Sequence, residues 1–230
     1  MANQEDVPQQ PTESTPSFDE QFQELQTLLA AERPPEQPSL VYLFGQTADN
    51  ESSVLAVANA YHERGVPIAF IGHDNVDPIS GYPGFLDWQQ KLKEQGIPLE
   101  GMQPIRGTTY MEEGVLRSNT YTEAEALVEH ARNNNLSSVV VIAPDFHLVR
   151  AFTSVVSFAL QRYPELKVYA KAGAALPSNE VVTHSQGVVQ ATREELPAIE
   201  RERFEIYHRK GDLVSPGEVV AYIKRRDTQE

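Results

Sequence analysis

The chain has 230 residues, a formal net charge of −14 and no cysteine. The absence of cysteine excludes disulfides, thiolate metal sites and cysteine nucleophiles. The acidic charge, with no stripe of Lys or Arg to offset it, argues against nucleic acid and anionic membranes as partners. No apolar run approaches the ~20 residues of a membrane span. The first residues also lack the basic region and apolar core of a secretory signal, so we expect a cytoplasmic protein.

The first 36 residues predict a tail, a short helix and a linker. Residues 1–16 are rich in Gln, Pro, Glu, Ser and Thr, a composition that favours a disordered acidic tail. Ser17 and Glu20 then match a capping box that opens an amphipathic helix to about Glu32, and a Pro-rich linker follows to residue 36. This helix can pack on its own domain, exchange across a homodimer or recruit a partner. Its apolar repeat consists of Phe18, Phe22, Leu25 and Leu29.

Strands and helices alternate over the rest of the chain. This order predicts one α/β domain over residues 37–230, with a Rossmann-like, mainly parallel sheet covered by helices on both faces in three layers. Strands are expected at 40–44, 67–71, 138–142 and 167–170, with a weaker candidate at 101–105. Helices are expected at 52–64, 85–95, 121–133 and 146–163, then at 192–210 with an interruption at Pro197, and last after a cap at Ser215.

Two polar strings mark the points where helices follow strands, which is where ligands bind in open α/β sheets. The first contains Asn119, Thr120 and Glu123. Thr120 can cap the helix while Glu123 returns a hydrogen bond to the Thr120 amide, a structural role worth ~1 kcal/mol. That role does not explain Asn119. A capped helix start also still offers amide groups and a positive dipole end to an anion.

The second string places His147 and Arg150 on one face of the first turn of a helix. The helix dipole disfavours cations at this end. An Arg there suits a phosphate or carboxylate through its bidentate fork, and a His there can act as an acid or base. The structural alternative is that Arg150 pairs internally with Asp145 or Glu123 while His147 packs in the core.

Other catalytic and binding patterns are weak in this sequence. A third polar cluster, residues 183–187 with Ser185, lies in an irregular stretch and can either close over the sheet edge or form a solvated turn. It lacks the Gly-x-Ser-x-Gly elbow of hydrolases, and the turn after the first strand lacks a phosphate-loop pattern. The six His residues show no metal-binding spacing, so we expect no metal, with His73 and Asp74 as the weak exception.

Several of these motifs, taken in order, resemble the YdcF-like family, a bacterial domain of unknown function related to SanA and ElyC. The matches are Gly45, Gly65-Val66-Pro67, Leu92 to Pro98, Asn119-Thr120 with Glu123, and His147 to Ala151. The resemblance covers about residues 40–170. It implies a Rossmann-like sheet with the paired motifs lining one cleft, and it adds S-adenosylmethionine to a nucleotide as a candidate ligand.

Together these observations support two hypotheses. In the first, the carboxyl edge of the sheet binds a small anionic or nucleotide-like ligand, with His147 and Glu123 as candidate acid/base residues. The ligand would be held by Gly45, Gly72, Asn119, Thr120, Arg150 and Ser185. In the second, the protein is a non-enzymatic interaction or regulatory protein that uses its acidic tail and N-terminal helix.

Overall fold

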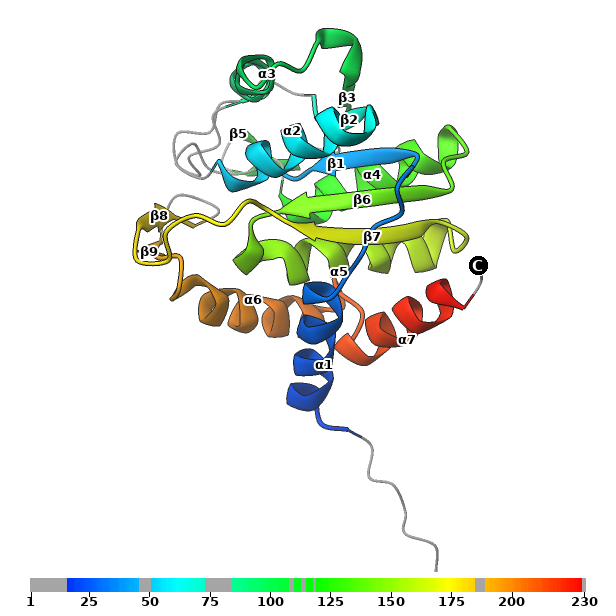
Figure 1. Ribbon diagram of the computed structural model, residues 1–230. Coiled ribbons are helices and arrows are strands. Elements are labelled where there is room, and N and C mark those ends of the chain that lie inside the picture. Colours follow the sequence, from blue (N-terminus) through cyan, green and yellow to red (C-terminus); the bar gives the residue numbers. More distant parts are fainter. Residues whose placement is uncertain are drawn as a thin grey trace, which may run out of the picture.

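The computed structural model describes residues 16–45, 51–72, 84–107, 110–112, 115–117, 119–184 and 189–228 (Figure 1). Its strands are β1 Leu40–Leu43, β2 Ile68–Ile71, β3 Met102–Ile105, β4 Tyr110–Glu112, β5 Val115–Arg117, β6 Ser138–Ala143, β7 Lys167–Ala172, β8 Val181–Thr183 and β9 Gln190–Thr192. Its helices are α1 Phe18–Ala30, α2 Ser52–Arg64, α3 Phe85–Glu94, α4 Thr120–Asn133, α5 Asp145–Arg162, α6 Leu196–Lys210 and α7 Pro216–Asp227, with a 3-10 turn, η1, at Leu99–Gly101.

Five parallel strands form the central sheet in the order β3-β2-β1-β6-β7. The predicted parallel α/β sheet is therefore confirmed. The order reverses between β1 and β6, because the chain leaves β1 toward β2 and leaves β6 toward β7. In open α/β sheets this reversal is where ligands bind, at the carboxyl ends of the strands. In Figure 1 the arrows of β6 and β7 point toward that edge, where β8 and β9 also lie.

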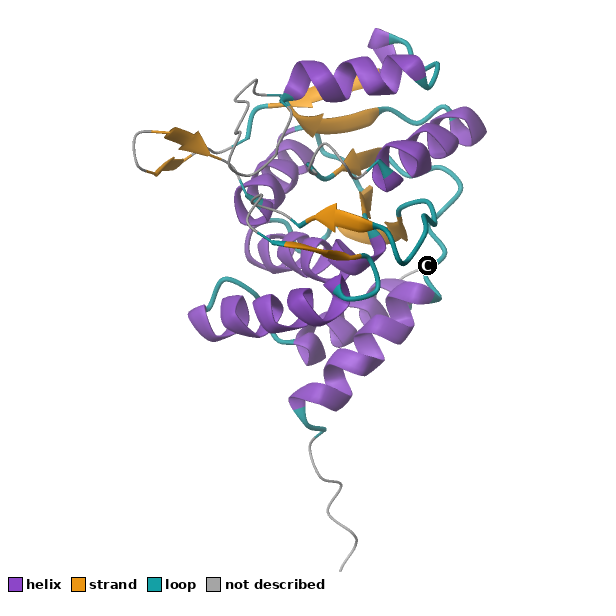
Figure 2. Ribbon diagram, turned by 90° about the vertical axis from the view of Figure 1, so that its left-hand side faces the viewer, coloured by secondary structure: helices purple, strands orange, loops and turns teal. Residues whose placement is uncertain are grey.

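The two faces of the sheet carry separate apolar cores because alternate strand residues point to opposite faces. Tyr42, Val139 and Val141 pack with α4 and α5 on one face. Val41, Leu43 and Val140 pack with α2 and α3 on the other. Figure 2 shows helices on both sides of the central strands, as the three-layer prediction requires.

Caps and glycines set the helix ends much as their sequence signals predict. Ser17 with Glu20 and Ser215 with Glu218 form complete capping boxes at α1 and α7. Gly211 ends α6 with a φ of 82°, a left-handed conformation that favours glycine. The predicted start of α6 at residue 192 is wrong, because Thr192 belongs to β9. Pro197 lies in the first turn of the helix, where proline costs no hydrogen bond, and does not interrupt it.

The amphipathic helix α1 packs on its own domain. Phe22, Leu25 and Leu29 are buried, and α1 lies against α7 and α5. Phe22 also meets Phe204 of α6 edge to face, with ring centroids 5.1 Å apart. The interpretation in which this apolar face recruits a partner is therefore wrong, because the chain itself covers the face. The predicted tail, apart from Pro16, lies outside the described residues.

Helix α7 covers the outer edge of β7. The Tyr222 hydroxyl accepts a hydrogen bond from the Val168 amide and donates one to the Leu166 carbonyl, both at 2.7 Å. Arg226 donates to the Val168 carbonyl and pairs with Glu32 at 2.7 Å. Side chains thus satisfy backbone groups that an edge strand otherwise leaves open to other strands. Among the described residues, no helix is long and apolar enough to cross a membrane.

Candidate functional site

The start of α4 lies beside the end of β1 and is capped differently from the prediction. The N-cap is Asn119, whose Oδ1 accepts from the Thr122 amide at 3.0 Å, while the Thr122 hydroxyl accepts from the Asn119 amide at 2.9 Å. The assignment of the cap to Thr120 and Glu123 is therefore wrong. Asn119 takes the cap because its side chain reaches the third amide of the helix, and Thr120 and Glu123 are left for other contacts.

Glu123 turns away from its own helix start toward β1. Its Oε2 accepts the Gly45 amide at 2.9 Å and lies 3.4 Å from the Tyr42 hydroxyl. Burial raises the pKa of Glu123 to about 7, although the hydrogen bonds from Gly45 and Tyr42 act to lower it. The carboxyl group can therefore gain or lose a proton near neutral pH, as acid/base chemistry requires.

Thr120, His147 and Arg150 meet in one buried network, as the sequence predicts, but Arg150 has a partner that the sequence did not reveal. Its guanidinium holds Glu200 of α6 in a bidentate pair, with Nε to Oε2 at 2.6 Å and Nη2 to Oε1 at 2.9 Å. Its Nη1 donates to Thr120 Oγ1 at 3.0 Å. His184 also contacts Glu200, from the turn after β8.

His147 lies at the centre of this network. Its Nδ1 is 3.2 Å from Arg150 Nη2 and 3.3 Å from Glu200 Oε2, and its Nε2 is 3.4 Å from Thr120 Oγ1. Burial, followed by the charge of Arg150, lowers the pKa of His147 to about 4. The imidazole is neutral at pH 7, so its electrostatics favour Glu123 over His147 as the acid/base residue.

The positive charge of Arg150 is balanced by a carboxylate inside the protein. Burial alone would raise the pKa of Glu200, but the Arg150 charge and the hydrogen bonds from His147 and His184 hold it well below its usual range. Glu200 is therefore an ionised partner for Arg150, and the expected role of Arg150 as the free cation that holds an anion needs correction. Arg150 does form an internal ion pair, as the structural alternative states, but its partner is Glu200 and not Asp145 or Glu123.

Two helix starts at the same sheet edge lack a side-chain cap. The N-cap residues are Glu51 for α2, which follows β1, and Pro144 for α5, which follows β6, and neither gives a side-chain cap hydrogen bond. In the first turn of α2, Ser53 Oγ is fully buried and has no partner among the described residues. These helix starts offer amide donors where the strand order reverses.

The chain leaving β7 crosses to the start of α2. The Ala174 amide donates to the Ser52 carbonyl at 2.8 Å, and the Gly173 amide donates to the Ala143 carbonyl at 2.8 Å. A Cβ on Gly173 would lie 2.6 Å from Ser52 Oγ, so only glycine allows this approach. The ends of β6 and β7 and the first turn of α2 are thereby held together.

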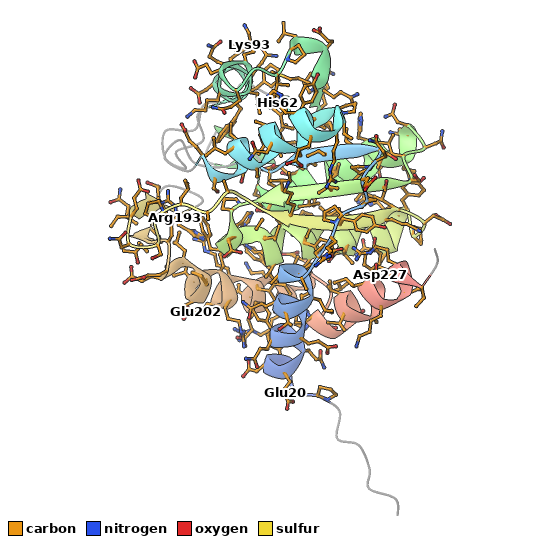
Figure 3. The ribbon with its side chains drawn as sticks, in the orientation of Figure 1. Glu20, His62, Lys93, Arg193, Glu202 and Asp227 are labelled. Atoms are coloured by element: carbon orange, nitrogen blue, oxygen red, sulfur yellow. The ribbon has the colours of Figure 1, made fainter. Side chains whose placement is uncertain are left out.

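Not every predicted site residue joins the network. The Gly72 amide donates to the Ile105 carbonyl at 2.8 Å and continues the pairing of β2 with β3, and no described contact links it to the network. Ser185, His73 and Asp74 lie outside the described residues. The β8–β9 hairpin is anchored by Arg193, labelled in Figure 3, which donates to the Pro177 carbonyl at 3.0 Å. No metal-binding cluster of acidic, His or Cys side chains occurs within the described ranges.

The sequence analysis did not predict Glu200, and it did not decide whether the segment that contains His184 packs on the sheet edge or is solvated. His184 is fully buried and contacts Glu200, while residues 185–187 of that cluster lie outside the described residues. A signal for Glu200 was present. Leu196, Glu200 and Phe204 are the buried residues of α6 and repeat every four positions, so an acid occupies the middle of an apolar stripe. A carboxylate placed there requires a buried cationic or hydrogen-bonding partner.

Comparison with known proteins adds little to this geometry. No protein-family model matches the chain, and no curated protein matches it. Among solved structures, the chain is similar to the trans-2-enoyl-CoA reductase of Treponema denticola in complex with NAD. The identity is 10%, the match covers 88% of this chain and 72% of that chain, and the TM-score is 0.30. A likeness at this level carries no inference about ligand or activity.

Proposed function

We propose that the protein is a divergent YdcF-like protein that binds a small phosphate-bearing, nucleotide-like ligand at the carboxyl ends of β1 and β6. The observation that carries this proposal is the pair of uncapped helix starts, α2 and α5, on the two sides of the strand-order reversal. The backbone amides of two helix starts without a side-chain cap and their positive dipole ends favour an anion there. The ordered motifs that resemble the YdcF-like family support the same edge.

Glu123 is the proposed acid/base residue of this site. It is buried, it binds the amide of Gly45 directly after β1, and its pKa is about 7. The Arg150–Glu200 pair has a positioning role, because it fixes Thr120 and His147 beside the start of α4. An anion that binds near Glu123 raises the pKa of this carboxyl further, since like charges disfavour its ionised form.

Isothermal titration calorimetry at pH 7 with ADP, inorganic phosphate and S-adenosylmethionine tests the proposal. Binding of ADP to the wild-type protein should be accompanied by proton uptake, seen as a dependence of the binding heat on the ionisation enthalpy of the buffer. Glu123→Gln should bind ADP without proton uptake. If ADP and phosphate fail to bind and S-adenosylmethionine binds, the phosphate-bearing ligand class is wrong.

A second pair of variants tests whether the ligand binds at the start of α2. Ser53→Ala removes a buried hydroxyl that has no partner among the described residues, so the fold should not suffer, while ADP affinity should fall about tenfold through loss of one hydrogen bond. Thr153→Val is the matched control. It removes another buried, unpartnered hydroxyl, deep within α5 and away from the sheet edge. Equal affinity in both variants would contradict binding at the start of α2.

A further inference from the structure

A cavity of about 450 Å³ lies behind the network, among α1, the end of β7, the start of α5 and α6. This volume falls within the range of small-molecule sites. Its apolar wall includes Phe22, Leu29, Val149 and Phe204. Arg150 and Glu200 line it as well, so the cavity and the proposed site share one wall. Glu123 and Ser53, the residues proposed to exchange the proton and to bind ADP at the start of α2, do not line this cavity, whereas Asp145 and Phe146 at the start of α5 do.

Glu32 lines this cavity and carries a buried carboxylate oxygen without a described partner. Its side chain is only 5% exposed, its Oε1 accepts from Arg226 at 2.7 Å, and its Oε2 is buried with no partner among the described residues. Arg226 is shared with Asp227, which it contacts at 2.8 Å. Two carboxylates therefore face one guanidinium, and the excess negative charge favours a cationic donor at Glu32 Oε2.

Lys171 supplies the opposite charge. It lines the same cavity from β7 and is partly buried. Its side-chain ammonium makes no hydrogen bond or ion pair within the described part of the chain. A partly buried ammonium without a partner favours an anionic group nearby. The cavity therefore combines an apolar wall with one free acceptor and one free cation.

From these groups we infer that the cavity binds a small zwitterionic molecule with an apolar body, whose ammonium group contacts Glu32 Oε2 and whose anionic group contacts Lys171. This is the chemistry of an apolar amino acid. Each charge of such a molecule meets a group that lacks a partner, and its apolar body covers the wall formed by Phe22 and Leu29. The inference does not depend on the proposed nucleotide site.

Calorimetry of the full chain with L-phenylalanine and with 6-aminohexanoate tests the inference, because the two probes differ in the separation of their charges. We expect at least one to bind, and we expect Glu32→Gln to weaken that probe at least tenfold. Glu24→Gln is the matched control, since Glu24 pairs with Lys224 of α7 at 2.7 Å but does not line the cavity. Lys171→Met should weaken the same probe without affecting n-hexylamine, which has no anionic group.

Two variants that add a bulky side chain test whether a loss of binding comes from a blocked cavity or from an unfolded protein. Ala30 lines the cavity and is exposed, so Ala30→Phe should block the probe while the protein keeps its melting temperature. Ala31→Phe places the same ring on the next exposed residue, which does not line the cavity, and should leave binding intact. The inference is overturned if neither probe binds the wild-type protein, or if the probe binds Glu32→Gln and Ala30→Phe as tightly as the wild type.

Discussion

Arg150 is the residue on which the interior of the candidate site depends. Its bidentate pair with Glu200 is buried on both sides, with side chains 7% and 5% exposed. Replacing it by leucine leaves Glu200 ionised and without its guanidinium. Because an uncompensated buried charge is costly, Arg150→Leu should lower the free energy of unfolding by ~3–5 kcal/mol. Urea denaturation monitored by circular dichroism measures this loss.

Arg162→Leu provides the control in the same helix. Arg162 pairs with Glu125 at 2.7 Å, but its side chain is 35% exposed, so its loss should cost no more than ~1 kcal/mol. The double variant Arg150→Leu with Glu200→Leu should recover part of the stability lost by Arg150→Leu alone, since no charge remains unpaired. An Arg150→Leu protein as stable as the Arg162→Leu protein would contradict a structural role for the buried pair.

The sequence could place His147 and Arg150 together because a spacing of three residues fixes one helix face. It could not supply Glu200, which reaches the site from α6, fifty positions beyond Arg150. That contact depends on how α6 crosses α5, and helix crossing is set by packing rather than by local pattern. The capping of α4 was assigned to the wrong pair for a local reason, since Asn119 and Thr120 are both suitable caps.

At the scale of elements, the long segments were predictable and the short hairpins were not. Strands such as β6 are buried on both faces and give continuous apolar runs, and α2 begins and ends at the predicted residues. The three-residue strands of β4–β5 and β8–β9 are too short for a period-2 pattern to emerge. The docking of α1 on α7 also needed the fold, because the same amphipathic face suits a partner equally well.

The Tyr222 hydroxyl satisfies one backbone amide at the edge of β7 that α7 covers. In Tyr222→Phe the Val168 amide loses its acceptor, and a buried amide without a partner costs ~1–3 kcal/mol. We expect the free energy of unfolding to fall by that amount, measured by urea denaturation. Tyr121→Phe is the control, because Tyr121 is 41% exposed. An unchanged stability for Tyr222→Phe would show that the edge of β7 does not need this bond.

At the scale of the whole molecule, Glu123 and His147 make stability depend on pH in opposite directions. The pKa of Glu123 is raised from 4.5 to about 7, so its contribution is present below pH 4.5 and is lost as the pH rises to 7. The pKa of His147 is lowered from 6.5 to about 4, so its contribution is present above pH 6.5 and is lost as the pH falls to 4. The two contributions partly offset each other in the wild-type protein.

Replacing each titratable group by an amide separates these contributions. Relative to the wild type, Glu123→Gln should gain stability progressively from pH 4.5 to 7, by up to ~3 kcal/mol, because 1 pKa unit corresponds to ~1.4 kcal/mol. His147→Asn should gain relative stability in the reverse direction, from pH 6.5 down to 4. Urea denaturation at half-unit pH steps gives both differences, and Glu202→Gln, which alters an exposed side chain, should show neither trend. If the differences for Glu123→Gln and His147→Asn stay constant across pH 4–7, these two groups do not titrate as their burial requires.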